Sequence, residues 1–230
     1  MSQCLWCLEN VEDSFSFSNL LYRNVTHNKM CDHCYSQLKP VSKGIGKCGR
    51  CEKISEDNLC PDCMNWEKIY PDYDFKHRSL FYYNEFAKAY LKKYKVMGDC
   101  ELSSLFAHEL RAHLRPISKQ ACIIPIPISQ DSKQMRGFNQ IELLLDSAEI
   151  PYITALKNIG QGEKQSKKNK VDRMKTPQPF VLETEMEPLV TGASILLVDD
   201  LYTTGRTLFH AADALKQYSP RRIETFSLFR

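Results

Sequence analysis

The first 63 residues contain eight of the ten cysteines, and these eight are spaced as four Cys-x-x-Cys pairs. Two thiolates at this spacing can share one tetrahedral zinc ion, and a second pair completes the site. Residues 1–66 show little helical periodicity, so we expect metal rather than an apolar core to hold this part of the fold. The predicted ligands are Cys4, Cys7, Cys31, Cys34, Cys48, Cys51, Cys60 and Cys63.

Spacing alone leaves the pairing of these cysteines open. The simplest assignment is sequential, with the first two pairs forming one zinc site and the last two pairs forming another. A cross-braced arrangement, or a single bound zinc ion, is compatible with the same spacing. A redox dithiol is disfavoured because four pairs crowd into so short a stretch. His27 and His33 lie nearby as alternative ligands, although surface positions are the simpler interpretation.

The N-terminal stretch has neither the basic nor the apolar segment of a secretory signal, which predicts a cytoplasmic protein. Attachment to the inner face of the membrane would then require a partner. Thiolate–metal sites are favoured over disulfides in such a reducing compartment. No apolar run approaches the roughly 18 residues of a membrane span. The formal net charge of +3 would fall to about −1 with two zinc tetrathiolates, so it says little about partners.

Apolar runs typical of buried strands alternate with amphipathic helices in the rest of the chain. We predict strands at 121–128, 194–198 and 223–229, and helices at 82–94, 103–114, 137–148 and 204–218. Pro116 is expected to end the second helix. This alternation predicts a three-layer α/β domain with a parallel-rich sheet. The predicted division is a cysteine-rich module at 1–66, a connector at 67–80 and the α/β domain at 81–230.

Residues 195–207 read Ile-Leu-Leu-Val-Asp-Asp-Leu-Tyr-Thr-Thr-Gly-Arg-Thr, a buried strand that runs into a polar loop and a helix. Backbone N–H groups at a helix start form an anion site, and hydroxyl groups add donors. The residues expected to bind phosphate are Thr203, Thr204, Gly205, Arg206 and Thr207. Asp199 and Asp200 can accept hydrogen bonds from the hydroxyls of a ribose. In the simpler alternative, the two aspartates only end a strand and cap a helix, with Thr204 as its N-cap.

A second polar cluster, at 126–140, follows another predicted buried strand. Because parallel strands end at the same edge of a sheet, we expect this cluster to lie close to the first one. Arg136 would contact a pyrophosphate through its guanidinium group, Gly137 would allow close backbone approach, and Ser129 would lie on the same side. The alternative is an ordinary helix start with a surface arginine.

The Asp-Asp-Leu-Tyr-Thr-Thr-Gly segment resembles the signature of type I phosphoribosyltransferases, which bind 5-phosphoribosyl-1-pyrophosphate (PRPP) with magnesium. Together with Arg-Gly-Phe-Asn-Gln at 136–140, the chain resembles the ComF family over nearly its whole length. The resemblance implies an N-terminal zinc ribbon and a type I phosphoribosyltransferase-like domain. It also implies that Asp199 and Asp200 bind the ribose and serve as the catalytic carboxylates, and that 203–207 bind the 5-phosphate.

The same resemblance implies a role in natural transformation, in which incoming single-stranded DNA is handled alongside a ComFA-type helicase. Residues 94–99 resemble a Lys-x-x-Gly-Asp element of the family, and 164–173 resemble its basic loop, here richer in lysine. The lysines predicted to contact nucleic acid are Lys92, Lys93, Lys95, Lys167, Lys168 and Lys170. Tyr90 and Tyr94 are spaced for base stacking, but core packing is the preferred interpretation.

Three functions fit this sequence. The favoured one is a DNA-uptake protein whose phosphoribosyltransferase domain binds PRPP or a related ligand. The second is an active phosphoribosyltransferase that acts on an unidentified acceptor. The third is a zinc-ribbon adaptor whose former active site only stabilises the fold. The presence of the complete phosphate loop, residues 203–207, argues against this third function.

Overall fold

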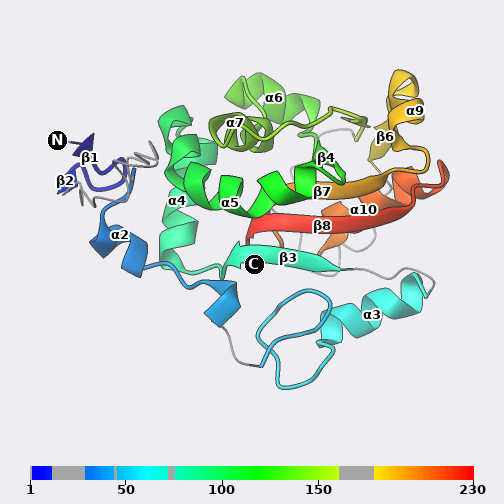
Figure 1. Cartoon of the computed structure of the whole chain (residues 1–230), viewed down its shortest axis with the longest axis horizontal. Coiled ribbons are helices and arrows are strands. Elements are labelled where there is room, and N and C mark those ends of the chain that lie inside the picture. Colours follow the sequence, from blue (N-terminus) through cyan, green and yellow to red (C-terminus); the bar gives the residue numbers. More distant parts are fainter. Residues whose placement is uncertain (1, 12–28, 44–45, 72–75, 161–178) are drawn as a thin grey trace.

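The computed structural model describes residues 2–11, 29–43, 46–71, 76–160 and 179–230. Its centre is a four-stranded sheet in the order β3-β8-β7-β4, in which all neighbours are parallel (Figure 1). The strands are β3 (His77–Phe81), β4 (Cys122–Pro125), β7 (Ser194–Leu201) and β8 (Arg222–Phe229). The expected α/β class with a parallel-rich sheet is confirmed.

Strand β7 is buried on both faces, as its apolar run predicts. Leu196 and Val198 belong to the core on one face of the sheet, and Ile195 and Leu197 belong to the core on the other. All four side chains are at most 4% exposed. Alternate side chains of a strand point to opposite faces, so one short run supplies both cores of a three-layer fold.

The first face of the sheet is covered by α4 (Glu85–Val96), the 3-10 helix η2 (Cys100–Phe106), α5 (Ala107–Ser118) and α7 (Gln140–Ser147). Helix α4 begins after Asn84, whose side chain accepts a hydrogen bond from the Ala87 N–H at 3.0 Å. Tyr90 and Tyr94 are fully buried on this face, which confirms their expected core role. Both side chains are 0% exposed, so neither ring is available for base stacking, and their hydroxyls donate to backbone carbonyls.

The second face is covered by α10 (Arg206–Lys216) and by α3 (Pro61–Ile69). The antiparallel hairpin of β5 (Leu156–Asn158) and β6 (Phe180–Leu182) packs beside α10, and η4 (Thr184–Met186) with α9 (Glu187–Val190) leads into β7. None of the helices in the described part of the chain is long and apolar enough to cross a lipid bilayer.

Two local expectations were wrong. Helix α5 continues to Ser118 although Pro116 lies within it, because a proline near the end of a helix removes one N–H donor from the last turn only. The stretch 126–140 also contains an additional helix, α6 (Gln130–Arg136). Gly137 separates α6 from α7 with a left-handed φ of 78°, which favours glycine.

The cysteine-rich part contains β1 (Ser2–Gln3), β2 (Asn10–Val11), α2 (Asp32–Ser36), the 3-10 helix η1 (Val41–Lys43) and the start of α3. Cys4 and Cys34 pack into the core that contains α4. Cys48, Cys51, Cys60 and Cys63 pack into the core that contains α10. The two halves of this part therefore join the cores on opposite faces of the same sheet.

Candidate functional site

The eight N-terminal cysteines gather into two tetrads. In each tetrad all Sγ atoms lie within 4.8 Å of one another. A tetrahedral zinc ion with Zn–S bonds of about 2.3 Å separates its sulfurs by roughly 3.8 Å. The Cys7–Cys31 and Cys51–Cys60 sulfurs are 3.6 Å apart. The donor sets therefore fit zinc. Cys4, Cys7, Cys31 and Cys34 form the first tetrad, and Cys48, Cys51, Cys60 and Cys63 form the second.

This grouping is the sequential arrangement, so cross-bracing is excluded. His33 belongs to neither group, and His27 lies outside the described residues. In the second tetrad, a hydrogen bond with Cys63 and the positive charge of Arg230 lower the pKa of Cys51 to about 5 although burial opposes this. The thiolate that a metal ion requires is thus already favoured at this cysteine.

Asp199 and Asp200 lie at the carboxyl end of β7, where ligands bind in open α/β sheets. The Asp200 side chain is almost fully buried, and one of its oxygens lies 2.5 Å from Lys95 Nζ. The Asp199 carboxylate accepts a hydrogen bond from the Asp200 N–H at 2.9 Å. Burial and the charge of Asp200 raise the pKa of Asp199 to about 7, and Lys95 opposes this shift. The pair therefore combines two close carboxylates with one counter-charge.

The chain then turns through Tyr202, Thr203 and Thr204 into α10. Gly205 occupies the N-cap position with a φ of 80°, and no side chain caps the helix. Neither aspartate nor Thr204 fills the capping role of the simpler alternative. A Cβ atom at Gly205 would clash with the ring of Tyr202, which is buried beneath the loop. Gly205 thus allows both the left-handed turn and the close approach of this ring.

The second polar cluster reaches the same edge of the sheet, since β4 is paired in register with β7. Ser129 caps α6 by accepting from the Ser132 N–H. Arg136 donates to the Gln140 side chain at 2.8 Å, and the Gln140 carbonyl accepts from the Tyr94 hydroxyl at 2.7 Å. Tyr94 adjoins Lys95, so the end of α4 connects this cluster to Asp200.

Comparisons with known proteins show the family of this chain. The phosphoribosyl transferase domain family matches residues 153–230, which include both aspartates and the loop. Competence protein ComFC of Streptococcus pneumoniae R6 is 31% identical over 99% of this chain and 100% of its own length. The chain belongs to the ComFC family. ComFC of Bacillus subtilis 168 is 30% identical over 99% of this chain and 94% of its own. Competence protein F of Haemophilus influenzae is 23% identical over 90% of this chain and 93% of its own.

The lysines predicted to bind nucleic acid have different surroundings in this ComFC-family structure. Lys92 is exposed on α4. The Lys93 ammonium lies 4.4 Å from the ring centre of Trp6, and Lys95 pairs with Asp200. Two of the α4 lysines thus contact the protein itself. Lys167, Lys168 and Lys170 lie outside the described residues.

No sequence pattern predicted two residues that contact the loop in this ComFC-family structure. Trp66 donates from its indole N–H to the Thr204 carbonyl at 2.6 Å, and the Arg230 guanidinium contacts the backbone of Thr203. Trp66 lay in a stretch with no motif of its own, and Arg230 follows a strand without any polar pattern. No local signal pointed to either residue, because their partners in the loop are far away along the chain.

Proposed function

We propose that this protein handles incoming single-stranded DNA during natural transformation as a late-competence DNA-uptake protein, and that its phosphoribosyltransferase-like domain binds PRPP or a related phosphoribosyl ligand. The observation that carries the ligand proposal is the Asp199–Asp200 pair, with Asp200 buried, directly before a glycine-containing loop at the start of α10. The DNA-uptake role rests on membership of a family whose members are named competence proteins.

The proposed ligand pose follows from the chemistry of each group. Asp199 and Asp200 accept hydrogen bonds from the ribose hydroxyls. The loop 203–207 binds the 5-phosphate with backbone N–H groups, hydroxyls and the positive end of the α10 dipole. Ser129, Arg136 and Gly137 lie on the pyrophosphate side. Carboxylate oxygens and phosphates are the ligands that Mg²⁺ prefers, so we expect magnesium to enter with PRPP.

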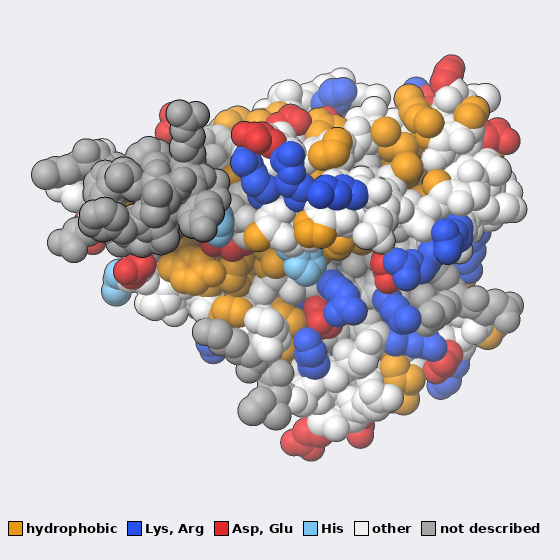
Figure 2. Space-filling model, in the orientation of Figure 1, with side chains coloured by type: hydrophobic (Ala, Val, Ile, Leu, Met, Phe, Trp, Pro, Cys, Tyr) orange, Lys and Arg blue, Asp and Glu red, His pale blue; other side chains and the backbone are white. Residues whose placement is uncertain are grey.

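We propose that single-stranded DNA contacts Lys92 together with Lys167, Lys168 and Lys170. Lys93 and Lys95 are less suited to this role because both already contact groups of the protein. Figure 2 shows further Lys and Arg side chains over α5, the helix that contains Arg111 and Arg115. Because Arg115 is exposed, a substitution of Arg115 serves as a comparison for substitutions of the proposed lysines in tests of DNA binding. Binding through phosphates should weaken steeply with salt.

We further propose that the chain works as a cysteine-rich module at 1–66, a connector at 67–80 and a phosphoribosyltransferase-like domain at 81–230. The proposed location is the cytoplasm, where a ComFA-type helicase would bring the protein to the inner face of the membrane.

The deciding experiment replaces both aspartates, as Asp199→Asn with Asp200→Asn, in the full-length protein. We expect PRPP binding in calorimetry to be lost, and DNA uptake to fail when the variant is expressed in a strain lacking the protein. Asp213→Asn, at an exposed position on α10, is the matched control. If the double variant loses PRPP binding yet supports normal transformation, ligand binding is not the operative function.

The second candidate function is a catalytically active phosphoribosyltransferase. The presence of the whole phosphate loop beside Asp199 and Asp200 favours it. This activity would release pyrophosphate from PRPP in the presence of an acceptor. A coupled pyrophosphate assay with pooled bases, amines and nucleic acid as acceptors distinguishes it from binding alone.

A further inference from the structure

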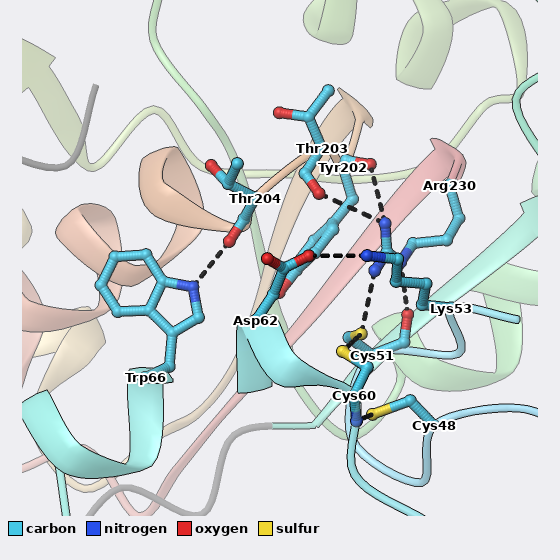
Figure 3. A network of polar contacts seen from close by, with 10 residues as sticks. All are labelled: Cys48, Cys51, Lys53, Cys60, Asp62, Trp66, Tyr202, Thr203, Thr204 and Arg230. Atoms are coloured by element: carbon cyan, nitrogen blue, oxygen red, sulfur yellow. Dashed lines mark hydrogen bonds and ion pairs between the residues drawn. The ribbon is translucent and has the colours of Figure 1, made fainter. Parts of the chain in front are cut away.

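The phosphate loop is held from one side by residues next to the second cysteine tetrad (Figure 3). The carbonyl of Thr204 accepts from the Trp66 indole at 2.6 Å. The Arg230 guanidinium donates to the carbonyls of Thr203 at 3.3 Å and Tyr202 at 3.5 Å. Three consecutive carbonyls of the loop are therefore bound by two side chains that lie on the same side of it.

Binding these carbonyls has a consequence for the opposite side of the loop. In a planar trans peptide, the C=O and the following N–H point in opposite directions. Holding the carbonyls of Tyr202, Thr203 and Thr204 thus turns the next three N–H groups away from Trp66 and Arg230. Those N–H groups belong to the stretch proposed to bind the 5-phosphate, where donor direction decides anion affinity.

Arg230 is itself fixed by the tetrad. Its Nε donates to the Cys51 carbonyl at 2.7 Å, and its Nη2 donates to the Cys51 sulfur at 3.0 Å. The guanidinium also lies over the Tyr202 ring, 4.5 Å from its centre. The backbone N–H of Arg230 donates to the Phe81 carbonyl at 2.9 Å, and this hydrogen bond restrains the Arg230 backbone. A metal ion that orders Cys51 would order this guanidinium as well.

Trp66 is linked to the same tetrad through helix α3. The helix starts directly after Cys60 and carries Cys63 one turn before Trp66. The indole stacks on Phe209 of α10, with ring centres 4.2 Å apart and planes inclined by 18°. Moving α3 would therefore move both the hydrogen bond to Thr204 and the contact with α10.

We propose that Arg230 and Trp66 are positioning residues of the phosphate site, through which metal binding at the second tetrad and ligand binding at the loop stabilise each other. The part of this inference that concerns PRPP binding rests on the proposed function. Coupling of two binding equilibria is reciprocal, so PRPP should strengthen zinc retention as zinc strengthens PRPP binding. The first tetrad is the internal control, because the aromatic residues beside it contact Phe86 of α4 and Phe81 of β3 rather than the loop.

The test is pulsed alkylation of the zinc-loaded full-length protein with a chelator present, followed by mass spectrometry, which reports metal loss cysteine by cysteine. We expect PRPP to slow alkylation of Cys48, Cys51, Cys60 and Cys63 about fivefold or more, and to leave the first tetrad unchanged. Arg230→Ala should abolish this difference. Arg222→Ala, at an exposed position on β8, should preserve it. PRPP that binds in calorimetry but protects both tetrads equally, or neither, overturns the inference.

A second measurement needs no ligand. Trp66→Phe keeps an aromatic ring against Phe209 but removes the indole N–H. We expect unchanged zinc content and faster amide exchange in the peptide that covers 202–209. Removing the metal ion from the second tetrad should also speed amide exchange in this peptide. Unchanged exchange in both experiments contradicts the coupling. If PRPP fails to bind the wild type at all, the proposed ligand is wrong, and this second measurement still decides whether tetrad and loop are coupled.

Discussion

Lys95 provides a positive charge beside two neighbouring carboxylates. Asp200 is only 2% exposed, and the Lys95 side chain is 21% exposed, so water screens this ion pair weakly. Removing one partner of a buried ion pair leaves an uncompensated charge, which costs more than the pair contributes as a whole. Lys95 is therefore expected to support the fold as well as the site.

This expectation can be tested with two lysines of the same helix. Lys95→Met should lower the free energy of unfolding by about 3 kcal/mol, because Asp200 loses its counter-charge. Lys92→Met, at an exposed position, should change it by no more than about 0.5 kcal/mol. Chemical denaturation at pH 7.5 measures both values. Equal stabilities of the two variants would contradict an energetic role for the Lys95–Asp200 pair.

The raised pKa of Asp199, about 7, predicts a pH-dependent ligand affinity. Below this pKa the carboxyl is mostly protonated, and above it the carboxylate forms, which is the better acceptor for ribose hydroxyls and magnesium. We expect PRPP with magnesium to bind more tightly as pH rises from 6 to 8, with proton release on binding. Calorimetry in two buffers of different ionisation enthalpy measures both. Asp199→Asn should flatten the profile, and a flat wild-type profile would refute this assignment.

The phosphate loop as an element depends on close contact between its glycine and its tyrosine. Gly205→Ala should cost about 2–4 kcal/mol, because an alanine is strained at this positive φ and its methyl group clashes with the Tyr202 ring. Gly192→Ala is the matched control, since its φ is 70° and nothing lies within 4 Å of the added atom. It should cost only about 1 kcal/mol. Thermal unfolding measures the difference, and PRPP affinity should fall in the first variant alone.

The edge strand β3 shows how the second tetrad supports the sheet. The N–H groups of His77 and Ser79 donate to the Arg50 carbonyl and to the Glu52 carboxylate, at 2.8 and 2.9 Å. An edge strand otherwise presents unpaired donors that invite pairing with another chain. The loop between Cys48 and Cys60 thus covers the edge of the sheet, while its cysteines belong to the core that contains α10.

At the scale of the whole molecule, the two tetrads belong to the cores on different faces of one sheet. Loss of the first tetrad, by Cys4→Ser with Cys7→Ser, should increase amide exchange in α4, where Trp6 contacts Phe86. Loss of the second, by Cys48→Ser with Cys51→Ser, should increase exchange in β3 and at the start of α10. Hydrogen exchange with mass spectrometry resolves these regions. Identical exchange patterns in both variants would show that the cysteine-rich part opens as one unit.

The sequence by itself determined several features that depend on neighbours within a few residues, although it missed α6 and ended α5 too early. Cysteine spacing predicted which cysteines gather into groups that could hold a metal ion. The apolar run predicted that β7 is buried on both faces, and the Asp-Asp-to-Thr segment predicted a strand, loop and helix in that order. Each of these follows from local geometry, which a short pattern records.

Only the tertiary structure decided which pairs of cysteines combine, that Lys95 faces Asp200 rather than solvent, and that Arg230 and Trp66 hold the loop. These contacts join residues as far apart as 179 positions for Arg230 with Cys51, and 138 for Trp66 with Thr204. Such contacts form because both faces of the sheet must be covered, and the covering segments place side chains according to packing rather than sequence distance. A local sequence pattern therefore cannot predict these long-range contacts.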